Sequence, residues 1–199
     1  MRTLLDTSAQ KIGIEQYFSY TTSVKEVEQS TLLFAQHRHN LIFEIRYNYD
    51  AKNAFSINAG RSFSFEKDKF SYVIRPTAGI VVGSFSGINL NLDQEVEMGR
   101  FYISSKFQRF ISLRDRCQSF FYTWQEGGIC FSEKFYGGLS LQMEIANRSC
   151  SMNKGIVLGF STGRWNFPVY IFDFLNCQKN ITAGILYNIN FTSPRHFSF

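Results

Sequence analysis

The sequence predicts an all-β protein: a closed antiparallel up-and-down transmembrane β-barrel of ten to twelve strands. Apolar and polar residues alternate with a period of two along most of the 199 residues, which is typical of strands with two different faces. The chain has 22 Phe and 10 Tyr but only 3 Pro, a composition that favours strands. It contains no run of about 18 apolar residues, so a conventional transmembrane helix is excluded.

The alternation is clearest in 41–50, where Phe43 and Ile45 fall on one face while Glu44 and Arg46 fall on the other. The runs expected to form strands are, in chain order, 12–21, 24–34, 41–50, 54–66, 70–83, 87–97, 100–113, 119–132, 135–147, 153–164, 167–176 and 179–191. Bacterial barrels carry even strand numbers. The choice is therefore ten strands with a loose N-terminal segment, or twelve, which we favour. We expect a single domain over 1–199, with core strands over about 12–191 and a tail at 192–199.

The expected connections are short at one end of the barrel and longer at the other. Tight joints are expected near 66–69, 98–100, 132–134 and 164–166, and longer ones near 83–87, 113–119 and 148–154. The short joint at 51–53 is the exception on the loop side. Unequal ends of this kind are typical of outer-membrane barrels.

Alternation alone does not tell which face points outwards, but three features favour lipid around the apolar face. A closed meander has no unpaired edge, as a bilayer requires. Aromatic residues gather near the ends of the runs, as interfacial girdles do, for example at 47–49, 120–124 and 165–167. The other face is rich in small polar residues and in charges of both signs that could pair in a narrow lumen. The charged residues expected to face the lumen are Glu44, Arg46, Arg75, Asp93, Glu95, Lys106 and Glu144.

The charge pattern argues against a nucleic-acid partner. The net charge is +5 and the pI is about 9.0, but Lys and Arg are dispersed, often at turns, instead of forming one basic face. Asp93, Glu95 and Glu97 share one face of a strand, with Arg75 and Lys106 on neighbouring runs. We interpret this as an ion-pair network, with a solute-attracting stripe as the alternative. The expected partners are the lipid bilayer and either a protein of the cell envelope or a small solute.

No pattern of catalytic or cofactor-binding residues is evident. His37 and His39 have no nearby Cys or carboxylate, so no metal site is expected, and with His196 they are expected at the short-turn end. The four cysteines have no zinc-ribbon or Cys-x-x-Cys spacing. One loop–loop disulfide among Cys117, Cys150 and Cys177 remains an alternative to free thiols, while Cys130 belongs to the other end.

Several segments resemble small outer-membrane β-barrel proteins of the Bacteroidota type. They are 41–50, 54–61, 74–87, 120–125 and 184–191, the last being similar to the terminal strand of such barrels. The resemblance implies a place in the bacterial outer membrane. Two features depart from that pattern: the first ten residues lack the apolar core of a signal peptide, and eight residues follow Phe191.

The function expected from these observations is that of a non-enzymatic outer-membrane barrel with a structural, narrow-channel or docking role. A soluble barrel that binds a lipophilic ligand is one alternative, because it would show the same alternation with its apolar face inside. An outer-membrane hydrolase is the other. It would need a His or Ser cluster at the outer loops, where the sequence places none.

Overall fold

The computed structural model describes residues 11–22, 25–37, 39–48, 52–114, 118–147, 149–174 and 179–190. Its strands are β1 (Lys11–Thr21), β2 (Glu26–Gln36), β3 (Leu41–Tyr47), β4 (Ala54–Arg61), β5 (Phe63–Lys67), β6 (Phe70–Gly83), β7 (Gly87–Met98), β8 (Phe101–Ser112), β9 (Phe120–Cys130), β10 (Phe135–Ala146), β11 (Ser149–Thr162), β12 (Trp165–Phe172) and β13 (Asn180–Asn190). Within these ranges, no helix is long and apolar enough to cross a membrane.

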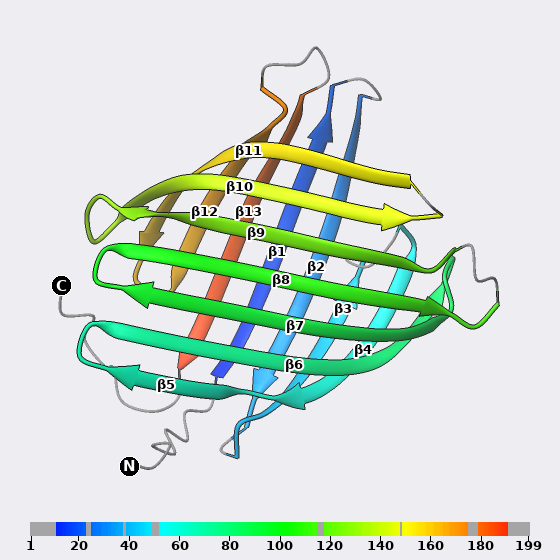
Figure 1. The fold of residues 1–199 in the computed structure, drawn as a ribbon, viewed down its shortest axis with the longest axis horizontal. Helices are drawn as coiled ribbons and strands as arrows, with labels where there is room; N and C mark the ends of the chain where they lie inside the picture. The colour runs from blue at the N-terminus through cyan, green and yellow to red at the C-terminus, as the bar shows by residue number, and fades with distance from the viewer. Residues whose placement is uncertain are drawn as a thin grey trace.

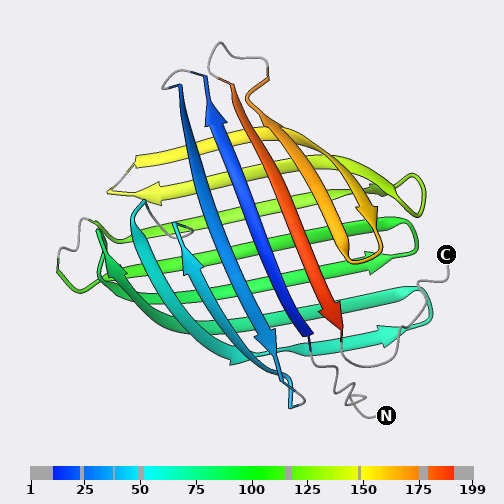
Figure 2. The same cartoon turned by 180° about the vertical axis from the view of Figure 1, so that it is seen from behind.

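The strands form one closed antiparallel sheet (Figures 1 and 2). Successive strands pair as hairpins, and the first strand pairs with the last from Lys11↔Asn190 to Thr21↔Asn180. Because the sheet is closed, each strand position around the barrel has a neighbour on both sides, so the described strands leave no free sheet edge. This confirms the predicted up-and-down barrel.

The barrel has twelve strand positions, here called staves, because β4 and β5 are two parts of one interrupted strand. Both pair with β6 in the same register, with Gly60 opposite Thr77 and Phe63 opposite Ile74. That register puts Pro76 opposite the interruption. Proline has no backbone N–H, so the ladder loses a hydrogen bond there. The predicted run 54–66 is therefore confirmed as a single stave, and the preferred count of twelve is correct.

Two of the expected connections differ in the structure. The joint expected to be long at 148–154 is a two-residue turn, because β11 already begins at Ser149 and pairs with β10 up to Ala146. The polar segment from Ser149 to Lys154 was missed as a strand, since it continues past β12 and both of its faces are exposed to a large extent. The joint expected to be short at 51–53 is longer, because β3 ends at Tyr47.

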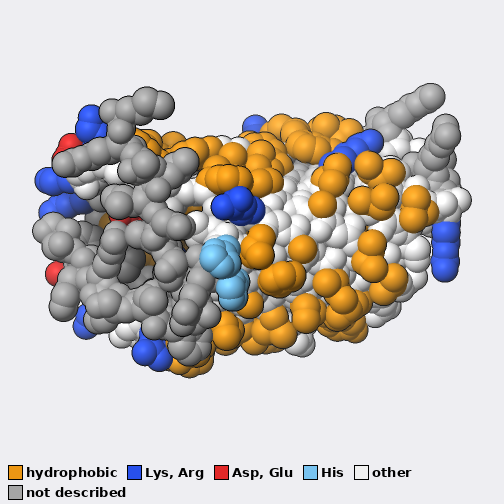
Figure 3. All heavy atoms as spheres, turned by 90° about the horizontal axis from the view of Figure 1, so that it is seen from below, with side chains coloured by type: hydrophobic (Ala, Val, Ile, Leu, Met, Phe, Trp, Pro, Cys, Tyr) orange, Lys and Arg blue, Asp and Glu red, His pale blue; other side chains and the backbone are white. Residues whose placement is uncertain are grey.

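Apolar side chains face the outside of the barrel and polar side chains face its interior. Along β3, Phe43 and Ile45 are 53% and 43% exposed, whereas Glu44 and Arg46 are 4% and 3% exposed. The same alternation recurs on the other strands, and Figure 3 shows hydrophobic side chains spread over the outer wall. An apolar exterior around a polar interior is the arrangement of membrane-spanning barrels, whereas a soluble barrel would bury the apolar face.

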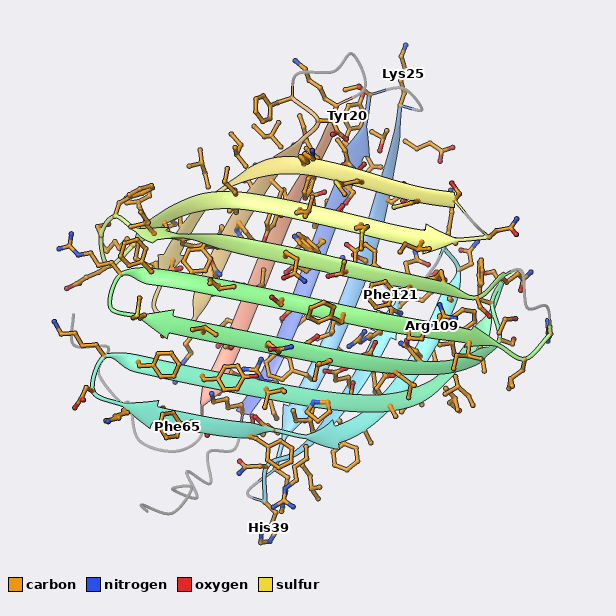
Figure 4. The ribbon with its side chains drawn as sticks, viewed as in Figure 1. Tyr20, Lys25, His39, Phe65, Arg109 and Phe121 are labelled. Atoms are coloured by element: carbon orange, nitrogen blue, oxygen red, sulfur yellow. The ribbon has the colours of Figure 1, made fainter. Side chains whose placement is uncertain are left out.

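Outward-facing aromatic rings form a belt at the end where the described chain begins and ends. The rings in contact are Phe65–Phe70, Phe135–Phe160, Phe160–Phe167, Trp165–Phe167 and Trp165–Tyr187, with centroids 4.4 to 6.4 Å apart. Phe65 is labelled in Figure 4. The prediction that the aromatic residues of 120–124 also belong to an outer girdle is only partly correct. Phe120 is 9% exposed and Trp124 packs on Tyr17 inside the barrel, because strand alternation turns every second aromatic ring inwards.

Candidate functional site: the barrel lumen

Charged side chains from five strands meet inside the barrel. They are Glu15 on β1, Glu44 and Arg46 on β3, Arg75 on β6, Asp93 and Glu95 on β7, and Lys106 on β8. Each occupies an inward position of its strand, since the neighbours before and after it lie on the outer wall. Strand alternation thus concentrates in the lumen charges that are scattered along the sequence.

A fully buried ion pair lies on β3. The Arg46 guanidinium donates from Nη2 and Nε to Glu44 Oε2, at 2.6 and 3.1 Å. Its Nη1 donates to Asn91 Oδ1 on β7, at 3.3 Å, and Asn91 donates in turn to Asn58 and Thr77. The network joins β3, β4, β6 and β7 within the lumen. Buried charges are tolerated when they are paired and hydrogen-bonded in this way.

A second ion pair crosses the lumen. Lys106 Nζ on β8 lies 3.0 Å from Glu15 Oε2 on β1. The strand order places β1 and β8 six staves apart around the barrel, on opposite walls (Figures 1 and 2). Because the two side chains touch across the barrel, a solute cannot pass between them. The pair therefore narrows the lumen at this level and marks a constriction.

Charges of alternating sign form a row across three neighbouring strands at the same level. Arg75, Asp93 and Lys106 are directly paired in the β6–β7 and β7–β8 registers. Arg75 also binds Glu95 with both terminal nitrogens, at 2.8 and 2.9 Å, a bidentate geometry that fixes both side chains. The Glu95 side chain is 48% exposed, so this part of the lumen is open to water.

Two hydrophobic clusters rich in aromatic rings also occupy the interior. The first consists of Tyr17, Val157, Tyr170 and Phe172, with Trp124, Tyr136 and Leu186 packed against it. The second consists of Ala54, Val81, Phe110 and Phe120, with Phe85, Tyr122 and Ala146 packed against it. Glu126 lies next to the first cluster and accepts hydrogen bonds from Tyr102 and Tyr170, at 2.7 and 2.9 Å. The lumen therefore contains packed apolar clusters and, between them, one region of charged and polar side chains.

The space left at the constriction is small. A cavity of about 10 Å³ lies between Arg46, Asp93, Lys106 and Tyr122, with Asn91, Phe107 and Gln108 completing its wall. A cavity needs roughly 10–15 Å³ to hold a single water molecule. This cavity therefore has room for no more than about one water molecule.

Six of the seven sequence-predicted lumen residues lie in these networks. The seventh, Glu144, is exposed near the loop end of β10, in register with Tyr122 and Ser151. Sequence reasoning missed Glu15 and Glu126. Glu15 follows Ile12 and Ile14 in an alternating run and could have been found by that signal, whereas Glu126 lies in a less regular run.

Groups that could bind metal do not cluster in the described part of the chain. His37 and His39 lie 5.5 Å apart at the β2–β3 turn, on the end predicted for them, and His39 is labelled in Figure 4. Cys130 and Cys150 are free thiols at opposite ends of the barrel. Cys117, Cys177 and His196 lie outside the described residues, as does the predicted 192–199 tail.

No protein-family model and no curated protein sequence matches the chain. Among solved structures, the fold is similar to that of the NanC porin, with a TM-score of 0.64 and 6% identity over 87% of this chain and 98% of that one. The KdgM porin gives a TM-score of 0.61 at 12% identity, over 88% and 98%. OccAB4 of Acinetobacter baumannii gives a TM-score of 0.53 at 9% identity, over 95% of this chain and 64% of that one. At these identities the comparison shows the fold alone, a closed β-barrel similar to those of these proteins.

Proposed function

We propose that this protein is a narrow channel of the bacterial outer membrane, closed in the described conformation and selective for small cationic solutes over anionic ones. The observation that carries the proposal is the Lys106–Glu15 ion pair across the lumen, at the level of an interior rich in carboxylates. An ion pair between opposite walls can open without any change in the barrel, because only side chains need to move.

The outer wall supports the membrane location. It is apolar along the strands and carries an aromatic belt at one end, while the closed sheet gives each described strand a neighbour on both sides. A bilayer requires all three properties. The porin neighbours support the outer membrane in particular, and the resemblance to barrels of the Bacteroidota type is retained as part of the proposal, as is a single domain over 1–199.

The interior charge supports the solute class. On the inner side of the strands lie the carboxylates Glu15, Glu44, Asp93, Glu95, Glu97 and Glu126, against the cations Lys11, Arg46, Arg75 and Lys106. A KdgM porin is known in complex with oligogalacturonate, which is a chain of carboxylates. A lumen with excess negative charge disfavours such a solute and raises the local concentration of cations.

A non-enzymatic role is also part of the proposal. The described histidines lie at the turn end opposite the longer loops, where an outer-membrane hydrolase would need them. A purely structural or docking role, in which the lumen never opens, remains the alternative that the experiment below distinguishes.

The test uses purified protein reconstituted in planar bilayers, with conductance and reversal potential measured under a KCl gradient. Lys106→Met and Glu15→Gln break the same ion pair but change the lumen charge in opposite directions. Both should raise the conductance several-fold. Lys106→Met should increase cation over anion permeability, and Glu15→Gln should decrease it.

The matched control is Lys25→Met, because Lys25 lies at the loop between β1 and β2, away from the lumen (Figure 4). It should leave both quantities unchanged. If neither lumen variant conducts more than the wild type, the channel proposal fails and the structural role is favoured. If both variants conduct without any opposite change in selectivity, the interior charges do not select the solute.

A further inference from the structure

A basic residue lies on the apolar outer wall within β8. Arg109 on β8 is exposed and is paired in register with Leu90 on β7 and Phe121 on β9. Leu90 is 46% exposed, so this register row is on the outside of the barrel. Figure 4 shows Arg109 and Phe121 on the same wall, towards the end of β8 that leads into the longer connection.

The surroundings of Arg109 are mostly apolar, with Thr123 on β9 as a polar neighbour in the next row. One step towards the loops lie Ile88 and Ile111, which are each 40% exposed, and one step towards the barrel centre lie Leu92 and Phe107. Within the described ranges, no carboxylate makes a hydrogen bond or ion pair with the Arg109 guanidinium. A guanidinium does not lose its charge in a protein, and the described residues supply no counter-ion for it.

A hollow lies beside this cation. It has a volume of about 200 Å³ and is lined by Leu90, Leu92, Phe107, Phe121 and Arg109 itself. Asn91 and Gln108, which lie between these residues along the strands, complete the lining. The Phe107 and Phe121 rings lie 6.5 Å apart. An apolar hollow next to an unpaired cation is complementary to an amphiphile with an anionic head beside a hydrocarbon chain.

The depth of Arg109 fits a lipid headgroup. It lies three positions before Ser112, the last residue of β8. At about 3.3 Å per residue and a strand tilt of roughly 40°, this is about 8 Å below the end of the strand. The aliphatic stem of arginine can cross most of this distance along the wall, so the guanidinium can reach the level of lipid phosphates.

We propose that Arg109 and the hollow beside it bind a phosphate-bearing lipid of the outer leaflet, with the phosphate on the guanidinium and an acyl chain between Leu90, Phe107 and Phe121. The guanidinium fork matches phosphate oxygens in a bidentate geometry, and the contact is stronger where water is scarce. The assignment to the outer leaflet rests on the proposed function, because it needs the loop end to face outwards. The site itself needs only a membrane.

The experiment is native mass spectrometry of the full chain in detergent, with three added probes: monophosphoryl lipid A, the same glycolipid without phosphate, and inorganic phosphate. The wild type should retain the phosphorylated lipid, and Arg109→Gln should reduce the bound fraction about tenfold. Leu92→Trp, which fills the hollow, should reduce it without any change of charge. The matched control is Arg61→Gln, an outward arginine at the opposite end whose guanidinium lies 5.7 Å from the Phe63 ring centre.

Equal retention by the wild type and Arg109→Gln would overturn the proposal. So would equal loss in Arg61→Gln, because binding would then be general to outward arginines. Displacement of the lipid by inorganic phosphate, or equal binding of the phosphate-free glycolipid, would also contradict it. Heat-dependent gel migration confirms that each variant is folded. Conductance is measured separately and should not change in Arg109→Gln, so failure of the channel proposal is distinguishable from failure of this one.

Discussion

Removal of Arg46 should destabilise the barrel more than any other single change of a charged residue in the described interior. Glu44 is 4% exposed, and among the described residues its carboxylate receives hydrogen bonds only from Arg46. In Arg46→Met the apolar stem is retained while the carboxylate stays buried without its partner. Breaking one partner of a buried pair costs about 3–5 kcal/mol. Asn91 also loses a donor, which places the expected cost in the upper part of that range.

The double variant Glu44→Gln/Arg46→Met separates the unpaired charge from the loss of packing. With both charges removed, the free energy of unfolding should return to within about 1–2 kcal/mol of the wild type, because a neutral replacement of a buried pair is often tolerated. The measurement is urea unfolding in phospholipid vesicles, followed by tryptophan fluorescence, with the midpoint and slope fitted for each variant.

The matched control for this cycle is Lys52→Met. Lys52 Nζ lies 3.2 Å from Glu26 Oε2, but the two side chains are 63% and 57% exposed. Exposed pairs contribute about 0–1 kcal/mol, so the control should unfold close to the wild type. The reasoning is refuted if Arg46→Met costs less than 1 kcal/mol, or if the double variant is no more stable than the single one.

Two further predictions test the outer wall and the inner packing. Leu139 and Leu113 are 71% and 72% exposed, but Leu139 lies within β10 whereas Leu113 follows the end of β8. Leu139→Arg should therefore lower the vesicle unfolding free energy by about 2–4 kcal/mol and Leu113→Arg by less than about 1 kcal/mol, and equal effects would argue against a membrane span. A methyl group added at Gly79 would meet the Ile57 carbonyl and the Asn58 side chain, whereas at Gly127 the nearest atom would be 3.8 Å away. Gly79→Ala should cost about 1–3 kcal/mol in the same assay and Gly127→Ala close to nothing, and the explanation fails if the order is reversed.

The predicted strand boundaries agree with the structure best where one face of the strand is apolar throughout. In 41–50 and 87–97 the alternation located the strands and identified their inward residues, because lipid and lumen impose different side chains on successive positions. The prediction was weaker beyond the expected membrane boundary. There the 149–154 segment is paired but polar, since the hydrophobic requirement no longer acts on it.

The aromatic interior shows a second limit of the sequence pattern. Phe110, Tyr170 and Phe172 are fully or nearly buried in the lumen, although aromatic residues were expected mainly in the outer girdles. A large ring satisfies either environment, since lipid and a packed lumen both accept apolar surface. Sequence alternation alone therefore does not assign aromatic residues to a face when both faces carry them.

The sequence by itself determined the all-β class and which side chains share a face of each strand, such as Glu44 with Arg46, because strand periodicity is a local property of neighbouring residues. The closed barrel decided the count of twelve strands and the inward direction of this face. Only the closed barrel decided that Lys106 meets Glu15, 91 residues away, and that this contact narrows the lumen. Which walls face one another depends on how twelve strands close into a ring and on their stagger. That relation is set by the register of all the strands together, so no single stretch of the sequence contains it.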